Sequence, residues 1–145
     1  MAIQKNGTGA LRLQKVLVIS FLFMVLGTAL ELYLLNHYEG VQQLIPLFCI
    51  GVAVFVFLLL FFRETKVLKN LFLLILGLTA LSGIYGTFLH LRANYEFEME
   101  MKPTATPRDL FLESISGALP ALAPCSMIVL SLIGYSYLLV LNYKR

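Results

Sequence analysis

The stretch VQQLIPLFCIGVAVFVFLLLFF, residues 41–62, decides the fold. It contains no charged side chain from one end to the other. A helix crosses a bilayer core of about 30 Å with roughly 20 apolar residues, and it satisfies every backbone polar group internally where water is absent. Residues 41–62 are therefore predicted to form a transmembrane helix.

Three further apolar stretches flank this one, at about 16–35, 67–91 and 119–141. Over the whole chain of 145 residues, 59% are hydrophobic and 13% are charged, against about 45–50% apolar in an ordinary soluble domain. A water-soluble fold could not bury so much apolar surface. The sequence predicts an all-α integral membrane bundle of four helices, formed as one domain over residues 1–145.

The basic residues predict the orientation of the bundle, because cytoplasmic flanks of membrane helices retain Lys and Arg. With the N-terminus inside, eight of the eleven cations are cytoplasmic and three are outside, whereas seven of the eight acidic residues lie toward the outside. Both termini are thus expected in the cytoplasm, and the protein in a cell inner membrane. The excess of positive charge reports this topology, and no nucleic-acid partner is expected because no basic stripe with interleaved aromatics is present. The outer cations are Arg92, Lys102 and Arg108.

The connections differ greatly in length. Residues 36–40 and 63–66 are tight loops, which should make each pair of joined helices antiparallel neighbours. The long connection is the outer one, residues 92–118. Its segment 95–101 alternates apolar and acidic residues, as a strand does, but Arg92 and Glu96 are also spaced to pair on a continuing helix. Both alternatives stay open at this point.

A short helix is expected later in this outer connection, over about residues 107–119. Thr106 is a suitable N-cap, Pro107 suits the first helical position, and Asp109 suits the positive helix N-terminus. Its mixture of apolar and polar residues indicates an interfacial helix. Pro120 and Pro124 follow, and each removes a helical hydrogen bond, so the start of the last span should be irregular.

Ionisable and polar residues gather at similar depth near the outer ends of the spans. Such residues are costly within a membrane and often functional. Glu31 lies about one turn inside the first span, and His90 continues a helix face of small residues through Gly83 and Gly86. The predicted ligand- or proton-binding pocket consists of Glu31, His37, Glu39, His90, Arg92, Asn94 and Glu96.

Three functions fit these residues. The first is a non-enzymatic accessory subunit, or a small binding or transport component, with this pocket facing outward. The second is a redox protein that holds haem between His37 and His90, and the third is an intramembrane enzyme that uses Glu31 and His90 as acid and base. A divalent metal on His37, His90 and Glu31 is a further possibility. No P-loop, GxSxG or GxGxxG motif supports an enzyme.

The expected surroundings follow from the same features. The chain should contact the lipid bilayer along its spans. With four spans in one protomer, a solute pathway would require a homo-oligomer or a larger membrane complex. Small residues in the last span, among them Ser131 and Gly134, favour close helix packing within the bundle or between copies.

Overall fold

The computed structural model describes the backbone of residues 2–143 and the side chains of residues 8–143. Lys5, Lys144 and Arg145, which contribute to the charge argument above, lie outside the described side chains. The described chain is helical, without any strand. Its elements are α1 (Ala2–Leu34), α2 (Val41–Phe62), α3 (Lys66–Met101), α4 (Pro107–Ile115), the short 3₁₀ helix η1 (Ala123–Cys125) and α5 (Ser126–Tyr143).

Four of these helical stretches are long and apolar enough to cross a membrane, as the sequence predicts. They cover Thr8–Leu34, Val41–Phe62, Lys66–Met101 and Ala123–Tyr143. The described part of the chain is therefore that of a multi-pass membrane protein. The second span has the predicted limits, whereas the first and third helices are longer than expected.

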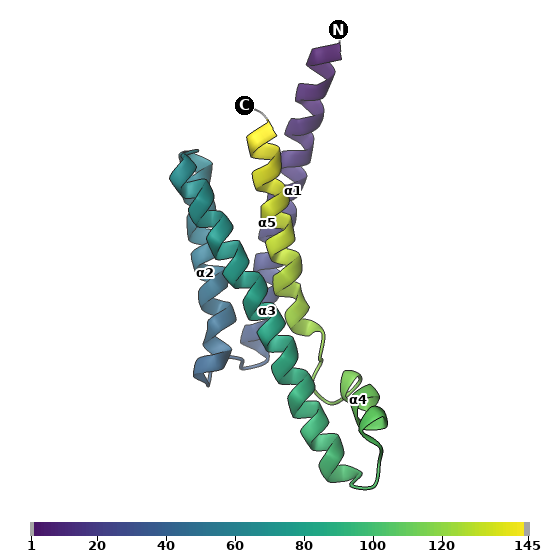
Figure 1. Cartoon of the computed structure of the whole chain (residues 1–145). Coiled ribbons are helices and arrows are strands. Elements are labelled where there is room, and N and C mark those ends of the chain that lie inside the picture. The colour runs from purple at the N-terminus through teal and green to yellow at the C-terminus, as the bar shows by residue number, and fades with distance from the viewer. Residues whose placement is uncertain (1, 144–145) are drawn as a thin grey trace.

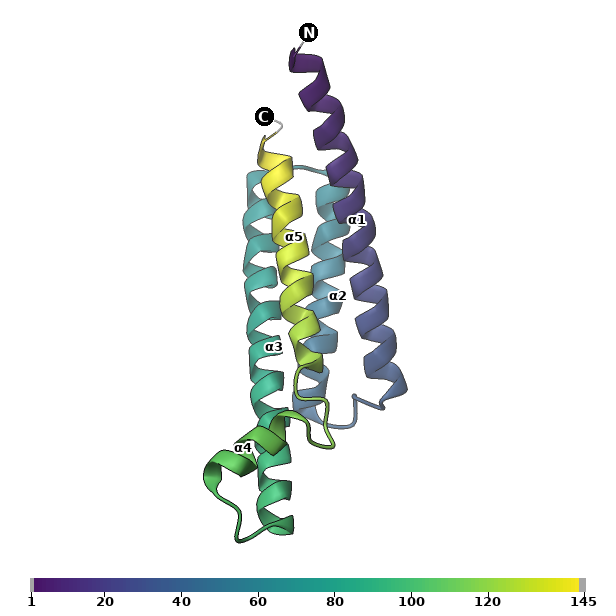
Figure 2. The same cartoon turned by 90° about the vertical axis from the view of Figure 1, so that its right-hand side faces the viewer.

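The four long helices run alongside one another, with both chain ends at the same end of the bundle (Figure 1, Figure 2). We call this the terminal end and the opposite one the far end. Helix α5 packs against α1 and α3, and α2 packs mainly against α3. Helices α1 and α2 touch each other far less than either touches its other neighbour. The tight loop between them makes them antiparallel neighbours, as predicted, although they pack more loosely than α2 and α3, the other pair joined by a tight loop.

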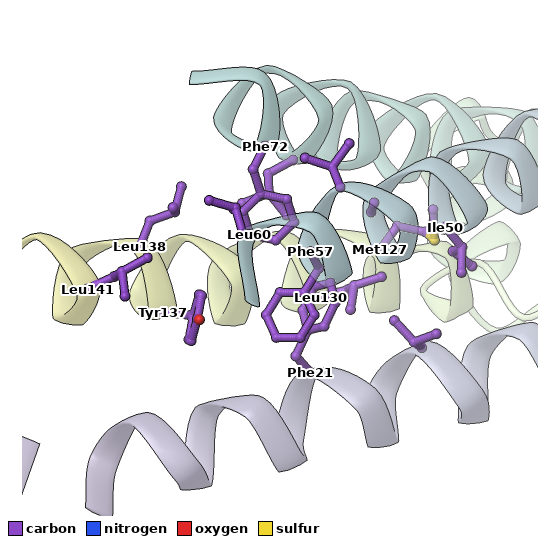
Figure 3. Close-up of a cluster of buried hydrophobic side chains, with 14 residues drawn as sticks. Phe21, Ile50, Phe57, Leu60, Phe72, Met127, Leu130, Tyr137, Leu138 and Leu141 are labelled. Atoms are coloured by element: carbon purple, nitrogen blue, oxygen red, sulfur yellow. The ribbon is translucent and has the colours of Figure 1, made fainter. Parts of the chain in front are cut away.

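Aromatic side chains form the centre of the core (Figure 3). The ring of Phe21 stacks on Phe57 with centroids 4.6 Å apart, and it meets Phe72 edge-on at 5.8 Å. The ring of Tyr137 lies 5.1 Å from Phe57. One cluster thus joins all four long helices. In a bilayer such contacts stabilise the bundle through van der Waals packing, because lipid is as apolar as the core.

Glycines allow α3 and α5 to approach closely. A Cβ built on Gly134 would lie 2.6 Å from a methyl group of Leu76, and one built on Gly83 would lie 2.7 Å from the carbonyl oxygen of Pro124. The predicted role of Gly83 in close packing is confirmed.

A buried lysine ties α3 to α5 at the terminal end. Lys69 is 9% exposed, and its Nζ donates to Asn142 Oδ1 at 2.8 Å. The carboxylate of Glu64 lies 3.9 Å from the same nitrogen. These partners offset the cost of burying the ammonium group.

Residues 92–101 continue α3 and form no strand, so of the two alternatives for this segment the structure has the helix, which extends ten residues beyond the apolar stretch 67–91. The physical reason is that the helix provides its own partners. The Nε of Arg92 lies 2.7 Å from Glu96, and Lys102 lies 3.4 Å from Glu98, both as i,i+4 pairs. A strand at 95–101 would have no neighbouring strand to accept its backbone hydrogen bonds.

Helix α4 begins as predicted but ends earlier. The hydroxyl of Thr106 accepts from the backbone N–H of Asp109, and Pro107 is the first helical residue. The helix stops at Ile115 because the following residues leave it to contact Asn94 on α3, as described below. Figure 2 shows α4 beside the far part of α3.

The start of the last span is irregular, as the two prolines predict. The turn at residues 121–122 and the 3₁₀ helix η1 precede α5, which begins at Ser126 and not at residue 119. Pro120 lies before η1 and Pro124 within it, where neither can donate a helical hydrogen bond.

Candidate functional site

A cavity of about 810 Å³ lies in the far half of the bundle. All four long helices contribute to its wall, together with the α1–α2 loop and the segment before α5. Its polar lining consists of Thr28, Glu31, His37, Gln42, Gln43, Ser82, Tyr85, His90, Arg92, Glu96 and Ser126.

The α1–α2 loop places His37 on the cavity. Asn36 adopts a left-handed backbone with φ 51°, a conformation that Asn tolerates better than most residues. The backbone N–H of His37 then donates to the carbonyl of Leu32 at 2.8 Å, which closes the turn. Helix α2 begins soon afterwards, at Val41. Its start is capped by Gln43, whose Oε1 accepts from the N–H groups of Glu39 and Gly40 at 2.9 and 3.1 Å.

The two histidines meet at this point. The ring centroids of His37 and His90 are 6.3 Å apart, edge to face. The Nδ1 of His90 lies 3.1 Å from the carbonyl oxygen of Pro120. A carbonyl oxygen only accepts, so Nδ1 carries the proton, and in the neutral ring Nε2 presents a lone pair. Helix breaking at Pro120 thus fixes the tautomer of His90.

The remaining polar groups are distributed between α1, α2 and α3. Gln42 Nε2 donates to the hydroxyl of Tyr85 at 3.2 Å, which bridges α2 and α3. Arg92 is paired with Glu96. Glu31 forms no hydrogen bond or ion pair with any side chain in the described range 8–143. The cavity therefore has one carboxylate without an internal partner.

Five of the seven residues predicted for the pocket line this cavity: Glu31, His37, His90, Arg92 and Glu96. Glu39 does not line it and lies exposed in the α1–α2 loop. Asn94 does not line it either.

Asn94 is 2% exposed and fastens the segment between α4 and η1 to α3. Its Nδ2 donates to the carbonyls of Ser114 and Leu119 at 2.9 and 2.8 Å. Its Oδ1 accepts from the N–H of Leu119 at 2.9 Å. A Cβ on Gly117 would lie 2.5 Å from the Asn94 side chain, so this position requires glycine.

Salt bridges hold α4 to the end of α3. Lys102 Nζ lies 2.6 Å from a carboxylate oxygen of Glu113. Hydrogen bonding to this ammonium lowers the pKa of Glu113 below its ordinary value. Lys102 also pairs with Glu98, so one cation joins the two helices.

Sequence reasoning missed Tyr85, Ser82 and the Pro120 carbonyl. The sequence did contain a pattern that indicates Ser82 and Tyr85. Both are at helical spacing from Gly86, Ala93 and Glu96, and all five lie on the face of α3 that lines the cavity. The carbonyl of Pro120 had no side-chain signal, because a backbone group acquires its role only through the fold.

The cysteines and acidic residues add no further cluster. Cys49 and Cys125 are both free thiols, and Cys125 Sγ lies 3.4 Å from Thr87 Oγ1. Among the side chains that the structure describes, no three His, Cys, Asp or Glu residues converge as a metal-binding group.

Acidification is expected to destabilise the fold through His37. Its pKa lies below the ordinary 6.5, first because burial desolvates the imidazole and second because a charged His90 would repel its proton. The unfolded chain then binds this proton more readily. The contribution of a neutral His37 to stability is thus complete above pH 6.5 and is lost as the pH falls from there through the lowered pKa.

Thermal unfolding in mild detergent, followed from about pH 8 to pH 5, measures this loss. We expect Tm to fall with pH, and the fall to be shallower in His37→Gln. Equal slopes in both proteins would contradict the assignment.

The chain was compared with protein-family models, curated proteins and solved structures, and none of them matches it.

Proposed function

We propose that this chain is a non-enzymatic binding protein of a cell inner membrane, an accessory subunit or small binding or transport component with an outward-facing pocket. One observation carries the proposal. Polar and charged side chains from two segments that are far apart in sequence, residues 31–37 and 90–96, come together on one cavity at the end of the bundle opposite the termini. Ionisable groups at such positions are retained mainly where they serve a ligand, an ion or a proton.

The charge distribution supports an outward-facing cavity. Arg63, Lys66 and Lys69 flank the loop at the terminal end, whereas the far end contains most of the acidic residues. From the positive-inside rule we infer that both termini lie in the cytoplasm and that the cavity faces the outer side.

With this orientation, we propose that α4 lies at the outer interface. Leu110 and Ser114 face inward and are buried, while Phe111, Leu112 and Ile115 are exposed. A helix with one side packed on the protein and an exposed apolar side is suited to the boundary between headgroups and acyl chains.

Filling the cavity should expel its occupant. Ala93 lies on α3 within the lining, and Ala93→Trp would place an indole ring in the space. Leu81→Trp is the matched control, because Leu81 lies on the same helix, is 60% exposed and does not line the cavity. We expect native mass spectrometry of protein purified in mild detergent to show a bound species in the wild type and in Leu81→Trp, and its loss in Ala93→Trp.

The absence of any bound species from wild-type protein, or its persistence in a folded Ala93→Trp variant, would overturn the proposal. Thermal unfolding of both variants confirms that they remain folded.

The redox alternative rests on the close approach of His37 and His90. Donation from His90 Nδ1 to a carbonyl leaves Nε2 for an iron, which is a common arrangement in ligand histidines. An absorption scan separates this alternative: a Soret band that disappears in His90→Ala would favour haem, and a colourless protein with an organic ligand would favour the binding function. The enzyme alternative has in its favour that Glu31 and His90 line the same cavity.

A further inference from the structure

The cavity is graded from polar to apolar along the bundle. Its charged groups and both histidines lie nearest the far end, from Glu31 on α1 to Glu96 on α3. Deeper positions have no charged group: they are lined by Ile45 and Pro46 of α2 and by Met127 of α5, together with the small hydroxyl side chains of Thr28, Ser82 and Ser126. A wall of this kind matches an amphiphile, whose head contacts the polar end and whose tail lies along the apolar part.

The weakest wall of the cavity lies between α1 and α2. These helices touch each other least among the neighbours in the bundle. Leu32 of α1, Leu35 of the α1–α2 loop and Ile45 of α2 line the cavity on this side. In a membrane this side faces hydrocarbon, so an amphiphile can enter laterally and leave its head at the polar end.

The charges of the lining specify the head. Arg92 is paired with Glu96 at 2.7 Å, so these two largely neutralise each other. Glu31 lines the cavity with an exposed side chain that has no partner among the described side chains, so a positive group of a ligand can reach it. With neutral histidines, the lining therefore has one uncompensated negative charge.

The hydrogen-bonding groups agree with a cationic head. An ammonium group has three donors and no acceptor. The lining offers acceptors: the Glu31 carboxylate, His90 Nε2, and Gln42 Oε1, since the amide nitrogen of Gln42 already donates to Tyr85. An anionic head would instead meet the uncompensated carboxylate of Glu31, while the one cation of the lining, Arg92, is already paired with Glu96.

We propose that the cavity holds one amphiphile from the outer leaflet, with an ammonium group in its head that pairs with Glu31. This assignment rests on the proposed binding function and adds the ligand class. Two sources share this chemistry: an aminophospholipid of the bilayer and a single-chain alkylammonium compound. Phosphatidylglycerol, an anionic phospholipid without an ammonium group, lacks it.

The test uses the delipidated full-length protein in mild detergent and native mass spectrometry with synthetic amphiphiles. Phosphatidylethanolamine and phosphatidylglycerol of identical acyl chains form one comparison, and a long-chain alkylamine is added separately. We expect phosphatidylethanolamine, the alkylamine or both to bind at least tenfold more tightly than phosphatidylglycerol. Preference for the phospholipid or for the alkylamine identifies the source.

Glu31→Gln removes the charge and retains the shape of the side chain. It should weaken binding of the ammonium amphiphile about tenfold, which corresponds to about 1.4 kcal/mol. Glu39→Gln is the matched control, because Glu39 is a carboxylate at the same end of the bundle but outside the cavity. It should bind as the wild type does. Equal Tm values would show that both variants are folded.

Equal or tighter binding of phosphatidylglycerol, or unchanged affinity in Glu31→Gln, would overturn the ligand assignment. If the wild type binds a species without an ammonium group and Ala93→Trp loses it, the binding function stands and only the ammonium assignment is wrong. If nothing occupies the cavity of the wild type, both fall.

Discussion

Replacement of Asn94 by alanine is expected to lower the free energy of unfolding by about 2–4 kcal/mol. The amide of Asn94 satisfies the carbonyls of Ser114 and Leu119 and the N–H of Leu119. Truncation removes all three hydrogen bonds at once and leaves a void beside Gly117. Each buried backbone group without a partner costs roughly 1–3 kcal/mol, and partial access of water reduces the sum.

Asn70→Ala is the matched control, since Asn70 lies on the same helix, is exposed, and its side chain makes no hydrogen bond within the described part of the chain. We expect its effect to stay within about 0.5 kcal/mol. Chemical or thermal unfolding in detergent measures both variants. A loss below about 1 kcal/mol in Asn94→Ala would show that the segment before η1 is held by other contacts.

Asn94→Asp provides a sharper test of the same hydrogen bonds. The carboxylate keeps the acceptor for the N–H of Leu119 but replaces the donor by an oxygen that faces two carbonyls. We therefore expect it to be no more stable than the alanine variant, although it is closer in shape to asparagine.

The four spans could be predicted from the sequence because the bilayer imposes a length and a composition that local residues alone must meet. The limits of residues 41–62 follow from the absence of charge within them, from Gly40 before them and from the charged residues Arg63 and Glu64 after them. The extension of α3 to Met101 could not be predicted, because the alternation at 95–101 suits a strand locally. A strand there would need a second strand to pair with, whereas the helix satisfies its own backbone and is supported by the i,i+4 pair Arg92–Glu96.

The candidate site could be predicted in part, by depth in the membrane. Glu31, His37 and His90 were predicted to lie at the same depth, and in the bundle all three line one cavity. Depth cannot show on which side of a helix a residue lies, so Asn94 was assigned to the pocket although it faces α4. Only the packing of neighbouring helices determines that direction.

Gly83→Ala is the second substitution for which we expect a large effect, about 1–3 kcal/mol of lost stability. The new methyl group would lie 2.7 Å from the carbonyl oxygen of Pro124 and 3.0 Å from Cβ of Met127. Neither atom is the end of a flexible side chain, so α3 and the start of α5 must move apart. Gly77→Ala is the control on the same helix, because nothing lies within 4 Å of its added Cβ. That variant should be neutral or more stable by up to about 1 kcal/mol, since alanine favours a helix over glycine.

The displacement in Gly83→Ala also reaches the cavity, which gives the prediction a second readout. Pro124 and Met127 both line it, and Pro120, just before η1, accepts from His90. Movement of this segment away from α3 should therefore weaken ligand binding as well as stability, whereas Gly77→Ala should leave binding unchanged. Unfolding and native mass spectrometry on the same preparations test both effects. Unimpaired stability in Gly83→Ala would mean that α5 does not approach α3 as closely as described. Lost stability with unchanged binding would mean that the ligand does not depend on the position of η1.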